Sequence, residues 1–499
     1  RSTDSTLLGR RSLSGTNLRI QVCYPWGPLQ AEKMAFIPDF HGMKIPRWLA
    51  LAGSYESRCF SRTSVAATTV DSADVLAMDA SIQSKEEGKL FKLLSKGNVL
   101  RALCKHISDG KTIMKHDLIN CIKDFRKYSR FQHAHEILRW MEKGEFAMSS
   151  SDYAIHLDII SKKDGITAAE AYFDRLPPSH KNKFTYGSLL HCYCERNMAE
   201  SALTLFWNME AAGLDNYMAY ESLISLYMRL NEPEKVPPLV KGMKAKSIRR
   251  RPFTYNCWMS SCAQLNRMDA VEKIAREIEM DREAWRDWTT HSNLAAIYVK
   301  AKAFDKAESA LGRMERLVPK DRRAYHFMIT LYAGTSNLEA VNRVWFYLKS
   351  CFPMNNRSSL IMLQALVSLG SVDGFRRCFQ EWESGCESYD LRIACVATKA
   401  FLSWGMLEDA DQVFQVAATK TSGPFFRVRA LFAEFFLKRK EMGHALEHME
   451  AAVLQGKAHK WLPDPDLVGE FFACLEEEKD IEGAERLRRA LNMGRRRVR

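Results

Sequence analysis

Residues 183–216 read KFTYGSLLHCYCERNMAESALTLFWNMEAAGLDN, a stretch that predicts two short helices joined by a turn. In both halves, apolar residues recur at i, i+3, i+4 and i+7, the spacing that places them on one face of an α-helix. Arg196 and Asn197 interrupt the pattern between the halves, and Gly213 is a natural C-terminal stop for the second helix. The stretch therefore predicts one helix-turn-helix unit.

The same unit recurs along the chain at a nearly constant period. Aligning the apolar and small residues gives ten unit starts, 33 to 36 residues apart: Lys115, Ser150, Lys183, Tyr217, Pro252, Trp288, Arg322, Asn356, Leu391 and Phe426. The fourth residue is tyrosine in five units, the twentieth is small or branched in nine, and the twenty-fourth is bulky in most. Small residues let a neighbouring helix approach, and bulky residues fill the groove between helices. We therefore predict an all-α solenoid in which each unit buries its apolar face against its neighbours.

This ladder of units divides the chain into four segments. Residues 1–80 lack the pattern and are expected to be a transit peptide or disordered, and residues 81–114 are expected to form N-terminal capping helices. The ten units occupy residues 115–464, and residues 465–499 hold a partial repeat and a C-terminal cap with a basic tail. A chain of 499 residues is too long for one compact core, but a repeat array escapes that limit because its contacts are between neighbours.

The composition favours a folded protein that associates with polyanions. The formal net charge is +13 and the isoelectric point is near 9.1. Such an excess favours RNA or a ribonucleoprotein surface, although it says nothing about the fold. The thirteen cysteines are scattered singly, which favours reduced thiols over a disulfide framework. No apolar run approaches the roughly 20 residues that a membrane-spanning helix needs, so no membrane association is expected.

The N-terminal segment has the composition of an organellar transit peptide. The chain starts with Arg1, and Met34 and Met43 are plausible translation starts. From Met43 onward the sequence is basic, rich in Ser, Thr and Ala, and poor in acidic residues. The stretch Arg58–Ser61 also resembles a mitochondrial processing site. We therefore expect the mitochondrial matrix, with the chloroplast as the alternative and an ordinary disordered tail as the non-functional interpretation.

Three short stretches carry a resemblance to a known family. Phe253–Asn256 (FTYN) and Phe184–Gly187 (FTYG) resemble the V-T-Y-N opening of pentatricopeptide repeats (PPRs), and Ala202–Met209 (ALTLFWNM) resembles their second-helix stretch A-L-x-L-F-x-x-M. Tetratricopeptide repeats have a similar period of about 34 residues but lack these two motifs. The chain is identified as a member of the PPR family, of the P class of plant organelles. The resemblance covers residues 115–491 and weakens after Asn356.

The resemblance implies a right-handed superhelical α-solenoid whose first helices line a concave RNA-binding surface, with one base read by each unit. In the family, the fifth and the last residue of a unit contact the Watson–Crick edge, so both must hydrogen-bond. Two of the ten pairs fit well: Asn256 with Asp287, which the family would read as U, and Ser292 with Asp321, which it would read as G. Two good pairs do not specify a transcript, so we expect weak sequence preference.

The second residue of each unit, which sandwiches bases in the family, changes type along the array. It is apolar in three early units, which favours base stacking there: Phe184, Met218 and Phe253. It is arginine in four late units, which we call the arginine row: Arg323, Arg357, Arg392 and Arg427. A guanidinium can stack on a base or bind a phosphate without reading sequence, so the row predicts a charge-driven RNA groove. The alternative is solvated surface arginine paired with a neighbouring Asp or Glu.

No constellation of residues in the sequence indicates catalysis or metal binding. The nearest approach is His191-Cys192-Tyr193-Cys194, but residues one and three apart on a helix cannot share a tetrahedral site, so core packing is the better interpretation. Phosphate-binding loops, dinucleotide fingerprints and the zinc-deaminase pattern of editing PPR proteins are not found. We therefore expect no enzyme activity, cofactor, metal or small-molecule substrate.

Two functions from different classes remain. The first is a non-catalytic RNA-binding protein in mitochondrial gene expression, which acts in RNA processing, stability or translation by gripping single-stranded or ribosomal RNA. The alternative is a structural scaffold in an organellar ribosome or another ribonucleoprotein complex, which docks ribosomal or other proteins together with RNA. Most of the ten base-reading pairs do not fit the family's pattern, which favours the scaffold. The two pairs that fit favour a protein that reads RNA sequence, here called the reader.

Overall fold

The computed structural model describes five stretches of the chain, and all regular secondary structure in them is helical: residues 90–95, 97–110, 112–144, 146–317 and 319–495. All five stretches belong to one unit. The predicted transit peptide, residues 1–80, lies outside the described residues. Within the described residues, no helix is both long and apolar enough to cross a membrane.

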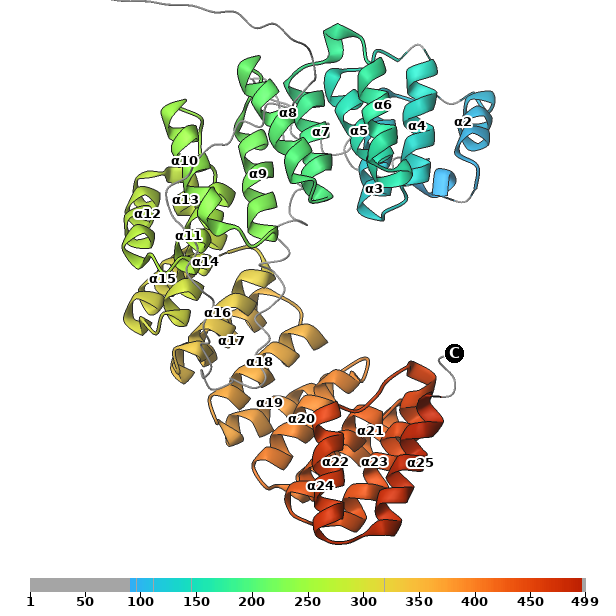
Figure 1. Ribbon diagram of the computed structural model, residues 1–499, viewed down its shortest axis with the longest axis vertical. Coiled ribbons are helices and arrows are strands. Elements are labelled where there is room, and N and C mark those ends of the chain that lie inside the picture. Colours follow the sequence, from blue (N-terminus) through green and yellow to red (C-terminus); the bar gives the residue numbers. More distant parts are fainter. Residues whose placement is uncertain (1–89, 96, 111, 145, 318, 496–499) are drawn as a thin grey trace, which may run out of the picture. The chain divides into compact units, whose positions relative to one another are not determined.

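Helix pairs follow one another along the described chain (Figure 1). The first helices of the pairs are α3 (Lys115–Lys127), α5 (Ser150–Asp164), α7 (Lys183–Glu195), α9 (Tyr217–Arg229), α11 (Pro252–Gln264), α14 (Trp288–Lys300), α16 (Arg322–Gly334), α18 (Asn356–Ser368), α20 (Leu391–Ser403), α22 (Phe426–Lys438) and α24 (Pro465–Glu477). The second helices are α4 (Phe131–Lys143), α6 (Ile166–Arg175), α8 (Ala199–Ala211), α10 (Val236–Ala245), α12 (Met268–Met280), α15 (Phe304–Arg316), α17 (Leu338–Cys351), α19 (Val372–Gly385), α21 (Leu407–Lys420), α23 (Met442–Gly456) and α25 (Ile481–Arg495).

Every predicted unit start, from Lys115 to Phe426, is the first residue of a helix. The prediction of an all-α solenoid of about ten helix-turn-helix units is therefore confirmed. Helix α2 (Val99–Ser108) precedes the array, and a short helix, α13 (Arg282–Arg286), is inserted before α14. Helices α24 and α25 form a further pair where the sequence predicted a partial unit. The division of the chain into four segments stays a prediction.

One residue with positive φ sets the turn between the two helices of each pair. In successive pairs this residue is Ser129, Gly165, Asn197, Asn231, Asn266, Lys302, Ser336, Gly370, Gly405, Lys440 and Lys479, with φ between 56° and 96°. In most pairs the next residue donates its amide hydrogen to a carbonyl five residues back, as Met198 does to Tyr193 O at 3.0 Å and Arg267 does to Cys262 O at 2.9 Å. This closure pairs carbonyls that a helix end leaves without partners. It explains why the amphipathic pattern breaks at Asn197.

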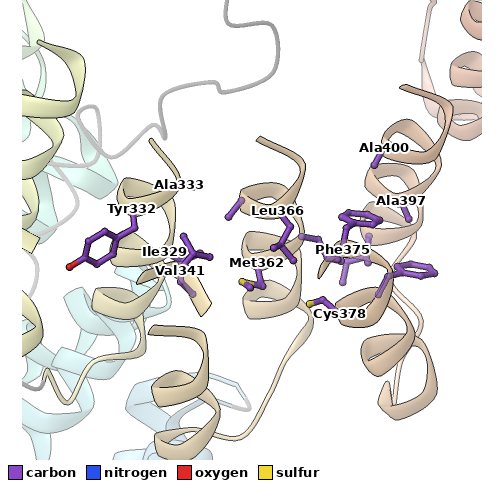
Figure 2. Close-up of a cluster of buried hydrophobic side chains, with 14 of the residues drawn as sticks. Ile329, Tyr332, Ala333, Val341, Met362, Leu366, Phe375, Cys378, Ala397 and Ala400 are labelled. Atoms are coloured by element: carbon purple, nitrogen blue, oxygen red, sulfur yellow. The ribbon is translucent and has the colours of Figure 1, made fainter. Parts of the chain in front are cut away.

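The core runs between the pairs at the positions that the period indicated. All nine small or branched residues at the twentieth position are 0% exposed. Figure 2 shows the core passing from pair to pair, with Val341 of α17, Met362 and Leu366 of α18 and Phe375 of α19 lying between neighbouring helices. The ring of Phe375 packs edge-on against Phe401 of α20, with 5.5 Å between centroids. Burial of a side chain of this size contributes about 1.5–3 kcal/mol.

Each first helix packs on the second helix of its own pair, and the first helices from α5 to α22 also pack on one another. Contacts between first helices run from α5 through α7, α9, α11, α14, α16, α18 and α20 to α22. Residues two, five, six and nine of a first helix lie on one side of it, because they are spaced i, i+3, i+4 and i+7. We call this side, taken across successive first helices, the first-helix face. All the residues that the sequence assigned to RNA within these helices fall on it.

Candidate nucleic-acid interface

The second residues, predicted to stack on bases or bind phosphate, reach the surface of the first-helix face. Phe184 is 39% exposed, and Met218 and Phe253 are partly exposed. All four members of the arginine row are exposed. The second residue of the helix between these two groups, Thr289 of α14, is partly exposed and polar. The surface therefore changes from apolar to basic between α11 and α16.

The last residue of each unit, which the family uses to read a base, is the N-cap of the following first helix: Ser149, Asn182, Asn216, Arg251, Asp287, Asp321, Asn355, Asp390, Phe425 and Asp464. In eight of them the side chain accepts a hydrogen bond from a helix amide; all do so except Arg251 and Phe425. Such a cap contributes about 1 kcal/mol to helix stability. Sequence reasoning missed this role, although Ser, Asn or Asp directly before a helix start is its usual signal.

Asn256 and Asp287 are brought together through a third side chain, Thr289. Asn256 Nδ2 donates to Thr289 Oγ1 at 3.2 Å, and Thr289 Oγ1 donates to Asp287 Oδ1. The Thr289 amide also donates to Asp287 Oδ1 at 2.8 Å, which caps α14. Asn256 Oδ1 is buried and has no hydrogen-bond partner among the described residues. A buried acceptor in this state costs about 1–3 kcal/mol.

The second code pair differs from the first, because Ser292 is buried and Asp321 is bound by Arg323. Ser292, on α14, is only 3% exposed. Asp321 caps α16 by accepting from the Arg323 amide at 2.9 Å, and its Oδ2 also lies 2.9 Å from Arg323 Nε. The carboxylate that the family would aim at guanine is thus already bound to a guanidinium of its own chain. This carboxylate is therefore available to a base only if its ion pair with Arg323 breaks.

The arginine row divides into two kinds of member. Arg323 is bound by its cap aspartate, and Arg392 is bound by Asp390 in the same way, with Nε 3.0 Å from Oδ1. Hydrogen bonds from Arg392 hold the pKa of the Asp390 carboxyl below its usual value, so this pair stays charged. Arg357 and Arg427 have no carboxylate within 4.0 Å among the described residues. The pairing that the sequence left open therefore holds for two arginines and not for the other two.

A buried ion pair joins the fifth residue of α9 to the next cap. Arg251 Nη2 lies 3.0 Å from Glu221 Oε2, and Thr254 Oγ1 donates to Glu221 Oε1 at 2.9 Å. Glu221 is 6% exposed. Because a buried charge needs both a partner and hydrogen bonds, this pair stabilises the junction between α9 and α11.

A similar bridge joins α16 to α18. His326 Nε2 lies 2.9 Å from Ser358 Oγ, which donates to Asn355 Oδ1 at 3.0 Å. Burial, together with the nearby Arg357 guanidinium, lowers the pKa of His326 to about 4. The imidazole is therefore neutral near pH 7. The fifth and last residues of units, here called the code positions, thus help to hold neighbouring units together at three junctions: α9 with α11, α11 with α14, and α16 with α18.

The cysteine-rich stretch of α7 lies in the core, as the sequence indicated. Cys192 and Cys194 are each 2% exposed, and burial raises the pKa of the Cys192 thiol to about 12. Such thiols are poor metal ligands, because binding requires the thiolate. Over the part of the chain that the structure describes, no group of three or more His, Cys, Asp or Glu side chains could hold a metal ion.

Comparison with known proteins agrees with this repeat geometry. The family profile of the PPR repeat matches residues 184–214 and 253–282. Two mitochondrial pentatricopeptide repeat-containing proteins of Arabidopsis thaliana are 43% and 41% identical to this chain. The first alignment covers 81% of this chain and 77% of the relative, and the second covers 86% and 87%. The large ribosomal subunit protein mL101 (rPPR4) of the same plant is 35% identical, over 79% of this chain and 82% of that protein.

A solved structure shares the fold. The crystal structure of the pentatricopeptide repeat protein PPR10 in complex with an 18-nt psaJ RNA element matches with a TM-score of 0.52 at 13% sequence identity. The match covers 80% of this chain and 65% of that chain, so this chain spans less than two thirds of it. At this level of identity the likeness concerns the arrangement of helices alone.

Proposed function

The chain belongs to the pentatricopeptide repeat family, and we propose that it is a non-catalytic RNA-binding protein of mitochondrial gene expression with weak sequence preference. The 43% and 41% identical relatives are both named mitochondrial, which supports the same location for this chain. The matching solved structure holds RNA, which supports RNA as the ligand. A fusion of residues 1–80 to a fluorescent protein tests the location, and accumulation in plastids would contradict it.

One observation carries the proposal: the buried acceptor Asn256 Oδ1 without a partner, beside the partly exposed Phe253 on the same helix. Asn256 as a whole is partly exposed, so rotation of its side-chain amide brings Oδ1 to the surface. There the N3–H of a uracil is a donor of the required kind, and Phe253 offers a surface on which the base can stack. Phe184 and Met218 offer similar surfaces on α7 and α9. The proposed RNA-binding surface therefore lies on the first-helix face of α7, α9, α11 and α14.

Weak preference follows from the other code positions. Glu221 is paired with Arg251, and Asp321 with Arg323, so neither carboxylate is available without breaking an ion pair. Binding then depends mainly on stacking and on the basic charge of the chain. Its affinity should fall steeply with salt concentration.

Crosslinking in mitochondria, followed by sequencing of the bound RNA, tests the proposal. A selective reader gives one short footprint that contains a uracil opposite α11. Footprints that cover ribosomal RNA broadly, together with co-sedimentation with ribosomes, would contradict the reader and support a scaffold.

The scaffold is the second candidate, and a specific observation favours it. The relative mL101 is named as a large ribosomal subunit protein, and the bridged code positions from α9 to α18 suit a rigid element better than a reader. In this function the chain would bind ribosomal RNA and ribosomal proteins together. Sedimentation of the chain with ribosomes after nuclease treatment separates the two candidates.

A further inference from the structure

The first-helix face of α18, α20 and α22 carries an apolar strip, which together with its neighbouring cations we call the late face. The fifth and sixth residues of these helices form the strip, and all are partly exposed: Leu360, Ile361, Cys395, Val396, Ala430 and Leu431. Helix α18 contacts α20, and α20 contacts α22, so the three pairs of residues are successive steps of one surface. Five of the six side chains are hydrocarbon, and the sixth ends in a thiol.

Three exposed cations stand on the same face, none with a carboxylate within 4.0 Å among the described residues: Arg357, Lys399 and Arg427. They are second or ninth residues, about one helical turn from the apolar pairs. The nearby carboxylates already have partners, since Asp390 binds Arg392 and Glu434 binds Lys438 at 2.6 Å. The late face therefore combines an apolar strip with positive charge that no side chain of this region balances.

This combination suits a polypeptide better than the bases of RNA. A base edge placed against Leu360 or Ala430 would lose its bonds to water and gain no partner, at a cost of about 1–3 kcal/mol for each unpaired group. None of the six strip residues is aromatic, so the stacking platform that single-stranded RNA uses is also missing from the strip. Apolar side chains, in contrast, gain free energy in proportion to the area that they bury.

We propose that the late face docks an acidic amphipathic segment of a partner protein. Apolar side chains of the segment cover Leu360 and Val396, and its carboxylates bind Arg357, Lys399 and Arg427. Packed helices lie about 8–10 Å apart, so three of them span roughly 20 Å. A segment of about six extended or thirteen helical residues has this length. The proposal goes beyond the RNA function, which uses α7 to α14, so either one can fail alone.

A fluorescent 14-residue peptide with glutamates on one helical side and leucines on the other tests the proposal by anisotropy with the purified full chain. We expect binding that weakens about tenfold with Arg357→Ala and Arg427→Ala together, because two charge-assisted contacts are lost. A similar loss is expected with Leu360→Asn and Val396→Asn together. The matched control is Arg377→Ala, which removes an exposed arginine from the second helix α19 and should leave binding unchanged.

Three outcomes would overturn the proposal. The first is failure of the glutamate peptide to bind, and the second is equal binding of a version with lysines in place of glutamates. The third is an oligouridine whose affinity falls tenfold in the Arg357→Ala, Arg427→Ala variant while peptide binding does not change, which would make the late face a surface for RNA phosphates. Unchanged thermal melting of each variant, followed by circular dichroism, shows that any loss is not unfolding.

Discussion

The first-helix face of α9, α11 and α14, here called the middle face, and the late face on α18, α20 and α22 share one backbone design but differ in chemistry. On the middle face, fifth residues are polar, and two of them bond to the next unit: Glu221 to Arg251 and Asn256 to Thr289. On the late face they are Leu360, Cys395 and Ala430. In both regions the apolar residues between neighbouring helices are buried. The residues of the first-helix face can therefore differ without altering how the helices stack.

The comparison shows that a repeat of constant period can carry more than one kind of surface. Polar fifth residues on this face help to hold neighbouring units together, and the acceptor Asn256 Oδ1 has no partner among the described residues. Apolar fifth residues make no such bridge and leave a strip that a ligand can cover. Reading every unit by one code would therefore miss the difference between the two regions. The predictions below test that difference, from the largest expected effect to the smallest.

Removing one partner of the buried ion pair should destabilise the middle face strongly. Arg251→Ala leaves Glu221 buried without its guanidinium, and we expect a loss of about 3 kcal/mol in the free energy of unfolding, measured by urea denaturation. Replacing both residues by methionine should restore most of the loss, because no charge is then left buried. Equal stability of the single variant and the wild type would show that this pair does not hold the units together.

Removing the unpartnered acceptor should weaken RNA binding, separately from any loss of stability caused by losing the Asn256–Thr289 hydrogen bond. Asn256→Ala should weaken binding of a uridine-containing oligonucleotide by about tenfold, or about 1.4 kcal/mol, because a hydrogen bond to the base is lost. The matched change on the late face, Leu360→Ala, should leave RNA affinity unchanged. If both variants bind RNA equally well, or lose affinity equally, the division of RNA contact between the two faces is wrong.

Acid should loosen the bridge at the boundary between the two faces. The folded-state pKa of His326 is about 4, below the ordinary 6.5, so the unfolded chain takes up this proton first. The stabilisation is therefore fully present above pH 6.5 and is lost as pH falls from 6.5 towards 4. We expect a loss of about 1 kcal/mol from this group, after allowance for solvent screening of a group that is not fully enclosed. Urea denaturation of wild type and His326→Asn from pH 7 to pH 4.5 measures it, and identical pH profiles would contradict the assignment.

Breaking an exposed cap pair should have the smallest effect. Arg392→Ala removes the partner of Asp390, but the arginine side chain is 69% exposed, and we expect at most about 0.5 kcal/mol in the free energy of unfolding. The cap itself remains, because Asp390 still accepts from the amide of residue 392 at 2.9 Å. A loss as large as that of Arg251→Ala would remove the energetic contrast between exposed and buried code pairs.

The sequence predicted where most residues of the candidate site lie, but not whether their side chains are already bonded to other residues of the chain. The sequence placed Asn256 and Asp287 at the fifth and last positions of one unit and the arginine row at the second position of four others, because register within the period is a local property. It did not show that Asp321 and Asp390 are held by Arg323 and Arg392, although an acid two residues before an arginine at a helix start was a readable signal. The assignment of these residues to RNA stays a prediction.

The sequence by itself determined the helix starts, the turns and the solenoid, because apolar spacing, a left-handed turn residue and small residues at packing positions act within one unit or its immediate neighbour. Only the tertiary structure decided which polar side chains are already used. The partners Glu221 and Arg251 are 30 residues apart, and Asn256 and Thr289 are 33 apart, so each pair meets only when consecutive units stack. Whether such a side chain faces a ligand or its own neighbour depends on that contact, which no local pattern records.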